Sequence, residues 1–287
     1  MRSRYTDKPM PFFKGNNQLV VVKKKEFIGL NVGYECSKWR YEAFSDYLFR
    51  WLVEFVTPFS DLIKVNHANC MDMIKRAASV VYSTDKYKRR GEFGELMLHA
   101  ILRELFDTEP IANKLFFKSA VNETVKGFDS VHARVDDEGE LELWLGEVKF
   151  YKSISRAVNA VASEISDHLQ KAKIREEFVC VGNIVDRKWE HAKKILRLFS
   201  TNTSLDDVFK IICIPVLLTY ESDIVKSAKS ISDQFLDSLR KELNQNHALF
   251  QSKISSIKIK VNLVLLPLDN KETLIQTLDR KLKGLQA

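Results

Sequence analysis

The stretch that decides the fold is residues 127–150, GFDSVHARVDDEGELELWLGEVKF. It predicts two strands joined by a tight turn, because two strand-like runs flank a short polar segment that contains a glycine. Side chains alternate between the two faces of a strand, so every second residue from Leu141 to Lys149 lies on one face. That face is apolar until Glu147 and Lys149, which indicates a strand that leaves the core and enters a site.

The turn fixes the position of Asp129 on the first strand. A three-residue loop at 137–139 that ends in a left-handed glycine pairs Asp136 with Glu140. The same register then places Asp129 opposite Glu147. A four-residue loop would shift the pairing by one residue, and the sequence leaves both turns open.

Two carboxylates that face each other repel, by roughly 3 kcal/mol at about 5 Å and an effective dielectric constant of about 20. Mg²⁺ turns this repulsion into attraction because it prefers carboxylate and water oxygens, and Mn²⁺ suits the same ligands. Lys149 would reach a metal-bound water or an anionic transition state. Asp129, Glu147 and Lys149 are therefore candidate catalytic residues for phosphodiester hydrolysis. A solvated hairpin with an ordinary Glu–Lys pair is the alternative interpretation.

A helix predicted over 91–105 carries two further acids in its first turn. Glu92 and Glu95 are three residues apart and share one face of this helix. Glu95 lies nearer the apolar stripe and is a candidate third metal ligand, whereas Glu92 is a possible accessory residue. Acids in a first turn also suit the helix dipole, so simple capping is the competing interpretation. His99 is interpreted as structural.

A second helix, predicted over 153–173, begins just after the second strand of the hairpin. Ser153 is placed to cap it. The first N–H groups of the helix would then lie near Lys149 and could bind a phosphate, which makes Ser153 a possible accessory residue. The candidate nucleic-acid contacts on this helix are Arg156, Gln170, Lys171 and Lys173, with a solvated helix face as the more ordinary interpretation of each.

The rest of the chain predicts strands that alternate with helices, which indicates an α/β sheet. The expected strands cover residues 18–32 (as a pair or one bent strand), 111–117, 177–185, 209–220 and 257–266. The expected helices cover residues 41–56, 67–82, 189–199, 224–250 and 271–282. A soft boundary is expected near residues 84–90.

Charge and hydropathy narrow the class of protein. Residues 1–90 hold 17 Lys and Arg against 9 Asp and Glu, whereas the remaining residues hold 28 against 29. This basic excess suits attraction of a polyanion such as DNA, and it equally suits docking on an acidic protein. The chain has no signal peptide and no apolar run long enough to span a bilayer, so we expect a cytoplasmic protein without a membrane partner.

The order of predicted elements resembles the core of the PD-(D/E)xK nucleases. That core runs αβββα, and its motif here is Asp129 followed by Glu147-Val148-Lys149; Phe128 stands where the general motif has Pro. The resemblance implies an α/β fold with a restriction-endonuclease-like core, an N-terminal α+β extension and C-terminal α/β additions. We expect a basic N-terminal region over residues 1–88 and the nuclease domain with its elaborations over residues 89–287.

Three segments resemble the HamA family, the nuclease subunits of Hachiman anti-phage defence. They are RGEFGEL at 90–96, GFDSVH at 127–132 and LWLGEVKFY at 143–151. This resemblance implies a Mg²⁺-dependent deoxyribonuclease that is released by a partner, the superfamily 2 helicase HamB. From the residues themselves we expect Asp129 and Glu147 to hold the metal, with Glu95, or less favourably Glu92, completing the shell.

Other functions stay open at this point. The first is a non-enzymatic subunit with a nuclease-like fold that docks a helicase or DNA, although the presence of Asp129, Glu147 and Lys149 argues against it. The second is a nuclease directed at RNA, because recognition of the 2′-hydroxyl leaves no short sequence motif.

Overall fold

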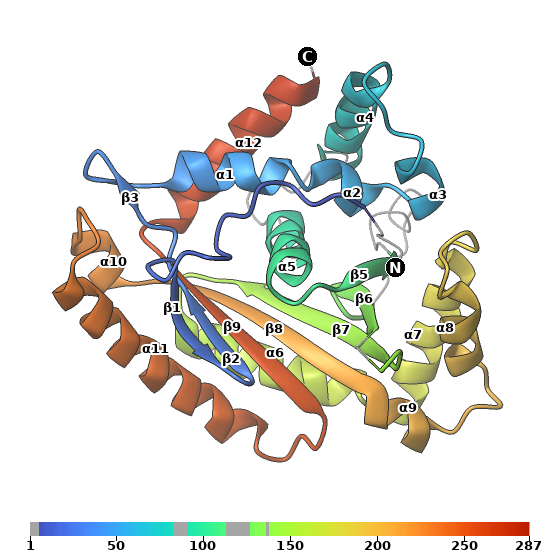
Figure 1. Cartoon of the computed structure of the whole chain (residues 1–287). Coiled ribbons are helices and arrows are strands. Elements are labelled where there is room, and N and C mark those ends of the chain that lie inside the picture. Colours follow the sequence, from blue (N-terminus) through green and yellow to red (C-terminus); the bar gives the residue numbers. More distant parts are fainter. Residues whose placement is uncertain (1–5, 83–90, 113–126, 136–137, 287) are drawn as a thin grey trace.

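Seven strands form one mixed sheet in a computed structural model that describes residues 6–82, 91–112, 127–135 and 138–286 (Figure 1). They are β1 (Val20–Lys24), β2 (Phe27–Leu30), β5 (Glu109–Ala112), β6 (Ser130–Val135), β7 (Leu141–Phe150), β8 (Ile212–Glu221) and β9 (Lys260–Leu268). Their order across the sheet is β1-β2-β9-β8-β7-β6-β5. Strands β3 (Tyr34–Glu35) and β4 (Lys38–Trp39) form a separate ribbon. The predicted α/β class is confirmed.

Helices cover both faces of this sheet (Figure 1). They are α1 (Tyr41–Phe49), α2 (Leu52–Val56), α3 (Phe59–Leu62), α4 (Cys70–Tyr82), α5 (Gly91–Leu105), α6 (Ile154–His168), α7 (Lys171–Ile184), α8 (Ala192–Phe199), α9 (Leu205–Ile211), α10 (Asp223–Ser227), α11 (Asp233–Ile254) and α12 (Lys271–Gln286). Figure 1 shows α5 with α1 and α2 on one side of the sheet and α6 with α11 on the other. None of the helices in the described ranges has the length and apolar content that a membrane crossing requires.

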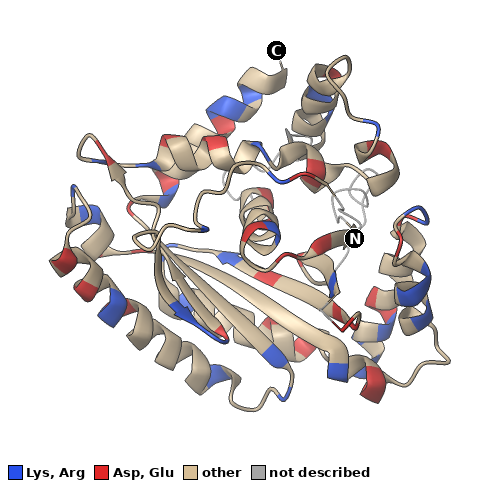
Figure 2. Ribbon diagram, viewed as in Figure 1, with Lys and Arg blue, Asp and Glu red and all other residues tan. Residues whose placement is uncertain are grey.

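The middle of the sheet is parallel and buried. Strands β7, β8 and β9 run parallel to one another, and β8 and β9 are almost continuous apolar runs. Such runs are typical of parallel strands that are covered by helices on both faces. Figure 2 shows few charged residues on these central strands. A charged side chain on β7 is therefore an exception to the pattern of its surroundings.

The β6–β7 hairpin has the register that the three-residue loop predicts. Val135 pairs with Leu141 and Ser130 pairs with Gly146, so one further step places Asp129 opposite Glu147. Gly139 has a φ of +82°, a left-handed conformation that glycine adopts without steric cost. The turn therefore sets which acid faces Glu147.

Helix α5 approaches β7 closely because two glycines leave room. A Cβ added to Gly94 would lie 3.2 Å from Val148 Cγ2, and one added to Gly146 would lie 2.9 Å from Leu98 Cδ2. Helix α5 itself matches its predicted bounds. The close packing brings Glu95 beside the end of β7.

Several predicted elements differ from the structure. The strand predicted over 177–185 is wrong, because these residues belong largely to α7. Apolar residues alternate locally there, but Ile174, Phe178 and Val181 are buried at the helical spacings of four and three residues. The helix predicted over 153–173 ends at His168, since Gln170 adopts an extended conformation before α7.

The helix predicted over 224–250 is also two helices, because Ala228 is extended and Ser232 caps α11. Likewise, residues 41–56 form α1 and α2, and the strand predicted from residue 209 starts at Ile212. Residues 113–117 of the strand predicted over 111–117 and the boundary at 84–90 lie outside the described residues. The division into two domains stays a prediction; β2 pairs with β9 in the same sheet.

Candidate active site

Asp129 is fixed by the backbone of the neighbouring strand. It directly precedes β6, and its Oδ2 accepts a hydrogen bond from the N–H of Val148 at 2.9 Å. Phe128, which stands where the general nuclease motif has Pro, is buried beside it. The hairpin thus holds a carboxylate next to Glu147 and Lys149 at the point where the β6–β7 ladder ends.

Glu147 is the most buried acid of this group, with 1% of its surface exposed. Its Oε1 lies 2.8 Å from His168 Nδ1, and its Oε2 accepts a hydrogen bond from Lys149 Nζ at 3.5 Å. The pKa of Glu147 is raised to about 7, first by burial and then by the charge of Asp129, against the opposing effect of His168 and Lys149. The neighbouring His168 and Lys149 therefore do not fully compensate for the burial of Glu147 and its repulsion from Asp129.

Lys149 is a buried cation among carboxylates. Its Nζ forms an ion pair with Glu164 and donates to the carbonyl of Val148 at 3.3 Å. Burial alone would lower the pKa of Lys149, but Glu147, Asp129 and Glu164 together raise it above its ordinary value. Lys149 is therefore protonated at neutral pH, and it can donate a hydrogen bond or offset negative charge but cannot act as a base.

Helix α6 supplies two residues that the sequence analysis missed. Glu164 and His168 are four residues apart and so lie on neighbouring positions of one helix face, directed at β7. The ring of Phe128 packs edge-on against His168, with 4.9 Å between the ring centroids. The sequence did contain a signal for these two residues. It is an acid and a histidine four residues apart on the helix that follows the candidate strand.

A cleft of about 580 Å³ opens beside these residues and contains both acids and bases. Glu95, Asp129 and Lys149 line it, which brings the candidate metal ligand on α5 to the same cleft as the hairpin. Its other charged lining residues are Lys152, Arg156 and Lys271. Lys271, from α12, donates to the carbonyl of Phe150 and lies 4.5 Å from the centroid of its ring. No pattern in the sequence pointed to Lys152 or Lys271 as part of this site.

The accessory residues take different positions. Ser153 caps α6 as predicted, since its Oγ accepts a hydrogen bond from the N–H of Arg156 at 3.4 Å, and it also lines the cleft. Glu92 is half-buried in the first turn of α5 and is not among the residues that line the cleft. Of the two acids on α5, Glu95 is thus the one placed near the hairpin.

The residue types at the hairpin fit a hard divalent cation. Within the described ranges, no three His, Cys, Asp or Glu side chains are arranged so that they could hold a metal ion. Mg²⁺, however, is commonly bound through one or two carboxylates and completes its shell with water. Asp129 and Glu147 supply two such carboxylates, and their mutual repulsion is a charge imbalance that a cation would relieve. Glu147 would exchange part of its pairing with His168 and Lys149.

Comparisons with known proteins give the family of the chain. A family model named HamA matches residues 11–282. The chain is also similar to anti-bacteriophage protein A of Escherichia coli (strain K12), with 30% identity over 177 residues, which cover 58% of this chain and 31% of that protein. The chain thus spans about a third of the length of this curated relative. Because the family model covers far more than half of the sequence, the chain belongs to the HamA family.

Proposed function

We propose that this HamA-family protein is a metal-dependent deoxyribonuclease that acts in anti-phage defence. The observation that carries the proposal is the meeting of Asp129, Glu147 and Lys149 at the end of one hairpin, beside a cleft with basic residues. The succession α5-β5-β6-β7-α6 supports a PD-(D/E)xK core. The family and the name of the relative support the role in defence.

The mechanism assigns each charged group a task. Asp129 and Glu147 would hold Mg²⁺, or Mn²⁺ in its place, and Glu95 would complete the protein share of the ligands. When bound, the ion supplies Lewis-acid activation of the phosphate and of a water. Lys149, which the surrounding carboxylates keep protonated, donates to the phosphate and offsets charge that develops in the transition state.

Other residues orient a metal ligand or bind the substrate. His168 holds the carboxylate of Glu147 in one orientation through its Nδ1. Lys152, Arg156 and Lys271 line the cleft and bind the phosphates on either side of the bond that is cut. The preference for DNA rests on the family resemblance, because phosphate contacts do not distinguish DNA from RNA.

The partner in this proposal is HamB, a superfamily 2 helicase, and this part rests on the family resemblance. One feature of the site supports a need for activation. Glu164 and His168 pair with Lys149 and Glu147, so the two catalytic groups are engaged by α6. A partner that shifts α6 would release both groups together.

A second candidate is a subunit without chemistry that docks a helicase or DNA. The observation in its favour is that the described residues hold no preformed group of three metal ligands. The two functions differ in a simple measurement, because a docking subunit does not bind Mn²⁺ at the hairpin.

The experiment compares wild type with Glu147→Gln and Lys149→Ala in the degradation of plasmid DNA and of RNA, with Mg²⁺, with and without HamB. We expect each variant to lose at least about a thousandfold in rate. Glu142→Gln is the matched control, because Glu142 also lies on β7 but pairs with Arg134 and Lys260. Equal cutting by Glu147→Gln and wild type would overturn the assignment.

A further inference from the structure

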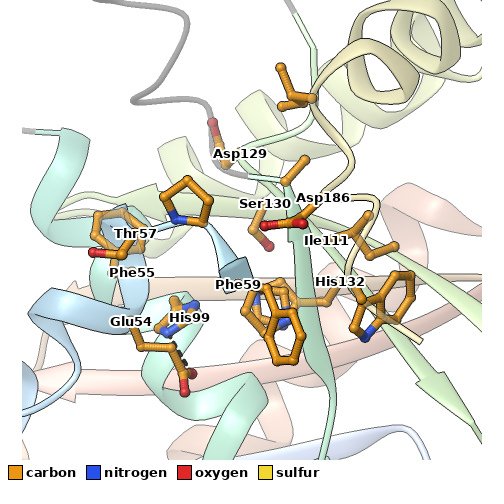
Figure 3. Close-up of a pocket in the computed structure, with 15 residues that line it drawn as sticks. Glu54, Phe55, Thr57, Phe59, His99, Ile111, Asp129, Ser130, His132 and Asp186 are labelled. Carbon is orange, nitrogen blue, oxygen red and sulfur yellow. Dashed lines mark ion pairs between the residues drawn. The ribbon is translucent and has the colours of Figure 1, made fainter. Parts of the chain in front are cut away.

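A second cavity, of about 170 Å³, adjoins the proposed catalytic site. It lies where the segment from α2 to α3 meets α5, strands β5 and β6, and the region between α7 and α8 (Figure 3). Figure 3 shows Asp129 at one end of this cavity and Glu54 with His99 at the other. Asp129 lines both the cavity and the cleft, so the two spaces meet at a proposed metal ligand.

The size and the walls of the cavity suit one flat ring. An apolar cavity of about 150 Å³ in another protein takes up benzene, so about 170 Å³ accommodates a single six-membered ring. Phe55, Phe59 and Trp189 line it and offer aromatic surface for stacking. Trp189 is held in place, since its Nε1 donates to Glu109 Oε2 at 2.8 Å.

The charges of the cavity exclude a phosphate. Of the described residues that line it none is Lys or Arg, while Glu54, Asp129 and Asp186 are acids. His99 and His132 are fully buried, and burial lowers the pKa of both, so they are neutral. An uncharged polar ring is therefore a better occupant than an anion.

Ser130 contributes a hydroxyl to the residues that line the cavity. Ser130 lines the cavity, and its buried Oγ has no hydrogen-bond partner within the described ranges. A buried hydroxyl without a partner costs free energy. Rotation of the Ser130 side chain would bring this hydroxyl, which now lies beside Gly146, to the edge of a nucleobase that supplies both a donor and an acceptor. Ser130 directly follows Asp129, so a base bound here would belong to a nucleotide at the proposed metal site.

We propose that the cavity binds one unstacked nucleobase, a pyrimidine by its size, from a single-stranded or frayed stretch of the substrate. The inference rests on the proposed function and names its substrate class. Enzymes that need a nucleotide outside the stack read the extruded base in a fitted pocket by stacking and by hydrogen bonds to its edge. The sugar–phosphate backbone then lies in the cleft with its basic residues.

The test measures binding rather than cutting, so Ca²⁺ replaces Mg²⁺. The ligands are labelled single DNA strands of twelve nucleotides. One strand is abasic throughout, and two others carry a single central thymine or adenine in an otherwise abasic backbone. We expect wild type to bind the thymine strand on the order of tenfold more tightly than the abasic strand and more tightly than the adenine strand. Equal affinity for the thymine and abasic strands would overturn the proposal.

Variants locate this preference in the cavity. Phe59→Ala removes a wall and should abolish the preference for thymine while affinity for the abasic strand is unchanged. Phe209→Ala is the matched control, because Phe209 is also half-buried but lines neither the cavity nor the cleft. A preference that survives in Phe59→Ala, or is lost equally in Phe209→Ala, would contradict the assignment. Circular dichroism confirms that each variant is folded.

Photochemical crosslinking shows directly where the base binds. A strand with a single 5-iodouracil should crosslink, on irradiation, to the peptides that carry Phe59 or Trp189. Crosslinks confined to the surface of α11 or α12 would overturn the proposal. Because neither measurement requires cutting, a failure of the base pocket and a failure of the nuclease assignment give different results.

Discussion

Two buried glutamates in this molecule have the same kinds of partner, but their pKa values are shifted in opposite directions. Glu54 lies beside His99 at 3.2 Å and Arg103 at 2.5 Å, and Glu147 lies beside His168 at 2.8 Å and Lys149 at 3.5 Å. Although burial raises the pKa of Glu54, His99 and Arg103 bring it down to about 2. The pKa of Glu147 is instead raised to about 7.

The difference comes from what surrounds each pair. Arg103 reaches Glu54 with two nitrogens, and it also donates to the carbonyl of Thr108 at 2.6 Å. Glu147 faces a second carboxylate, Asp129, and shares Lys149 with Glu164. A glutamate whose charged form is favoured by its partners stabilises the fold, whereas one whose charged form is disfavoured by burial and a second carboxylate is suited to bind a cation.

The largest expected effect is on the activity of the Glu147 variant, and it should come without a loss of stability. Glu147→Gln should lower the rate of DNA cutting by at least about a thousandfold, because a metal ligand is lost. It should leave the free energy of unfolding unchanged or higher, because repulsion from Asp129 is relieved. Activity assays and urea unfolding check both parts. A variant that is inactive because it is unfolded would refute the comparison.

Glu54 is expected to matter for stability, in contrast to Glu147. Glu54→Gln should lower the free energy of unfolding by about 3–5 kcal/mol, because the buried Arg103 loses its ion pair with Glu54. Urea unfolding at neutral pH measures this loss. A loss no larger than that of Glu147→Gln would show that the two glutamates do not differ in their structural role.

The pH dependence of stability gives the sign of the Glu54 effect. A pKa of about 2 in the folded state against an ordinary value of 4.5 means that this stabilisation is fully present above pH 4.5. It is lost as pH falls from 4.5 toward 2, by on the order of 3 kcal/mol. The gap in unfolding free energy between wild type and Glu54→Gln should therefore narrow below pH 4.5. A gap that is constant over this range would contradict the prediction.

A smaller effect is expected from a change at Gly127, which should alter the position of Asp129 relative to Glu147. A Cβ added to Gly127 would collide with the buried carboxyl of Glu177, so Gly127→Ala should displace this carboxyl from its buried position or shift the backbone that leads to Asp129. We expect a loss of about 1–3 kcal/mol in stability, with reduced activity. Glu177→Ala in the same chain should restore part of both, as a double-mutant cycle would measure.

Gly284→Ala is the matched control for this prediction. An added Cβ meets nothing within 4 Å there, and Gly284 lies in α12. Equal losses in Gly127→Ala and Gly284→Ala would show that the effect is not one of collision with Glu177.

The parts of the site that depend on local pattern were predictable from the sequence. The period of two in β7 placed Glu147 and Lys149 on one face, and Ser153 marked the start of α6. One of the two turns that the sequence left open places Asp129 opposite Glu147, and the structure has that register. Residues that reach the site through tertiary packing were not predictable. His168 and Glu164 depend on which face of α6 packs on β7, and Lys271 arrives from a helix that begins 121 residues after Phe150.

The errors in the fold have a similar physical origin. Local alternation in α7 imitates a strand, and the helical face of Ile174 and Phe178 becomes visible only when the packing partners are known. The cavity beside Asp129 could not be anticipated at all, because its walls come from distant segments such as α3 and the residues around Trp189.

The central claim is that Asp129 and Glu147 form a site for a divalent cation, and direct titration with Mn²⁺ tests it. Electron paramagnetic resonance measures free Mn²⁺ in the presence of wild type, of Asp129→Asn/Glu147→Gln and of Glu54→Gln. We predict that wild type and Glu54→Gln bind Mn²⁺ alike and that the double variant does not. Undiminished binding by the double variant, or no binding by wild type, would contradict the claim.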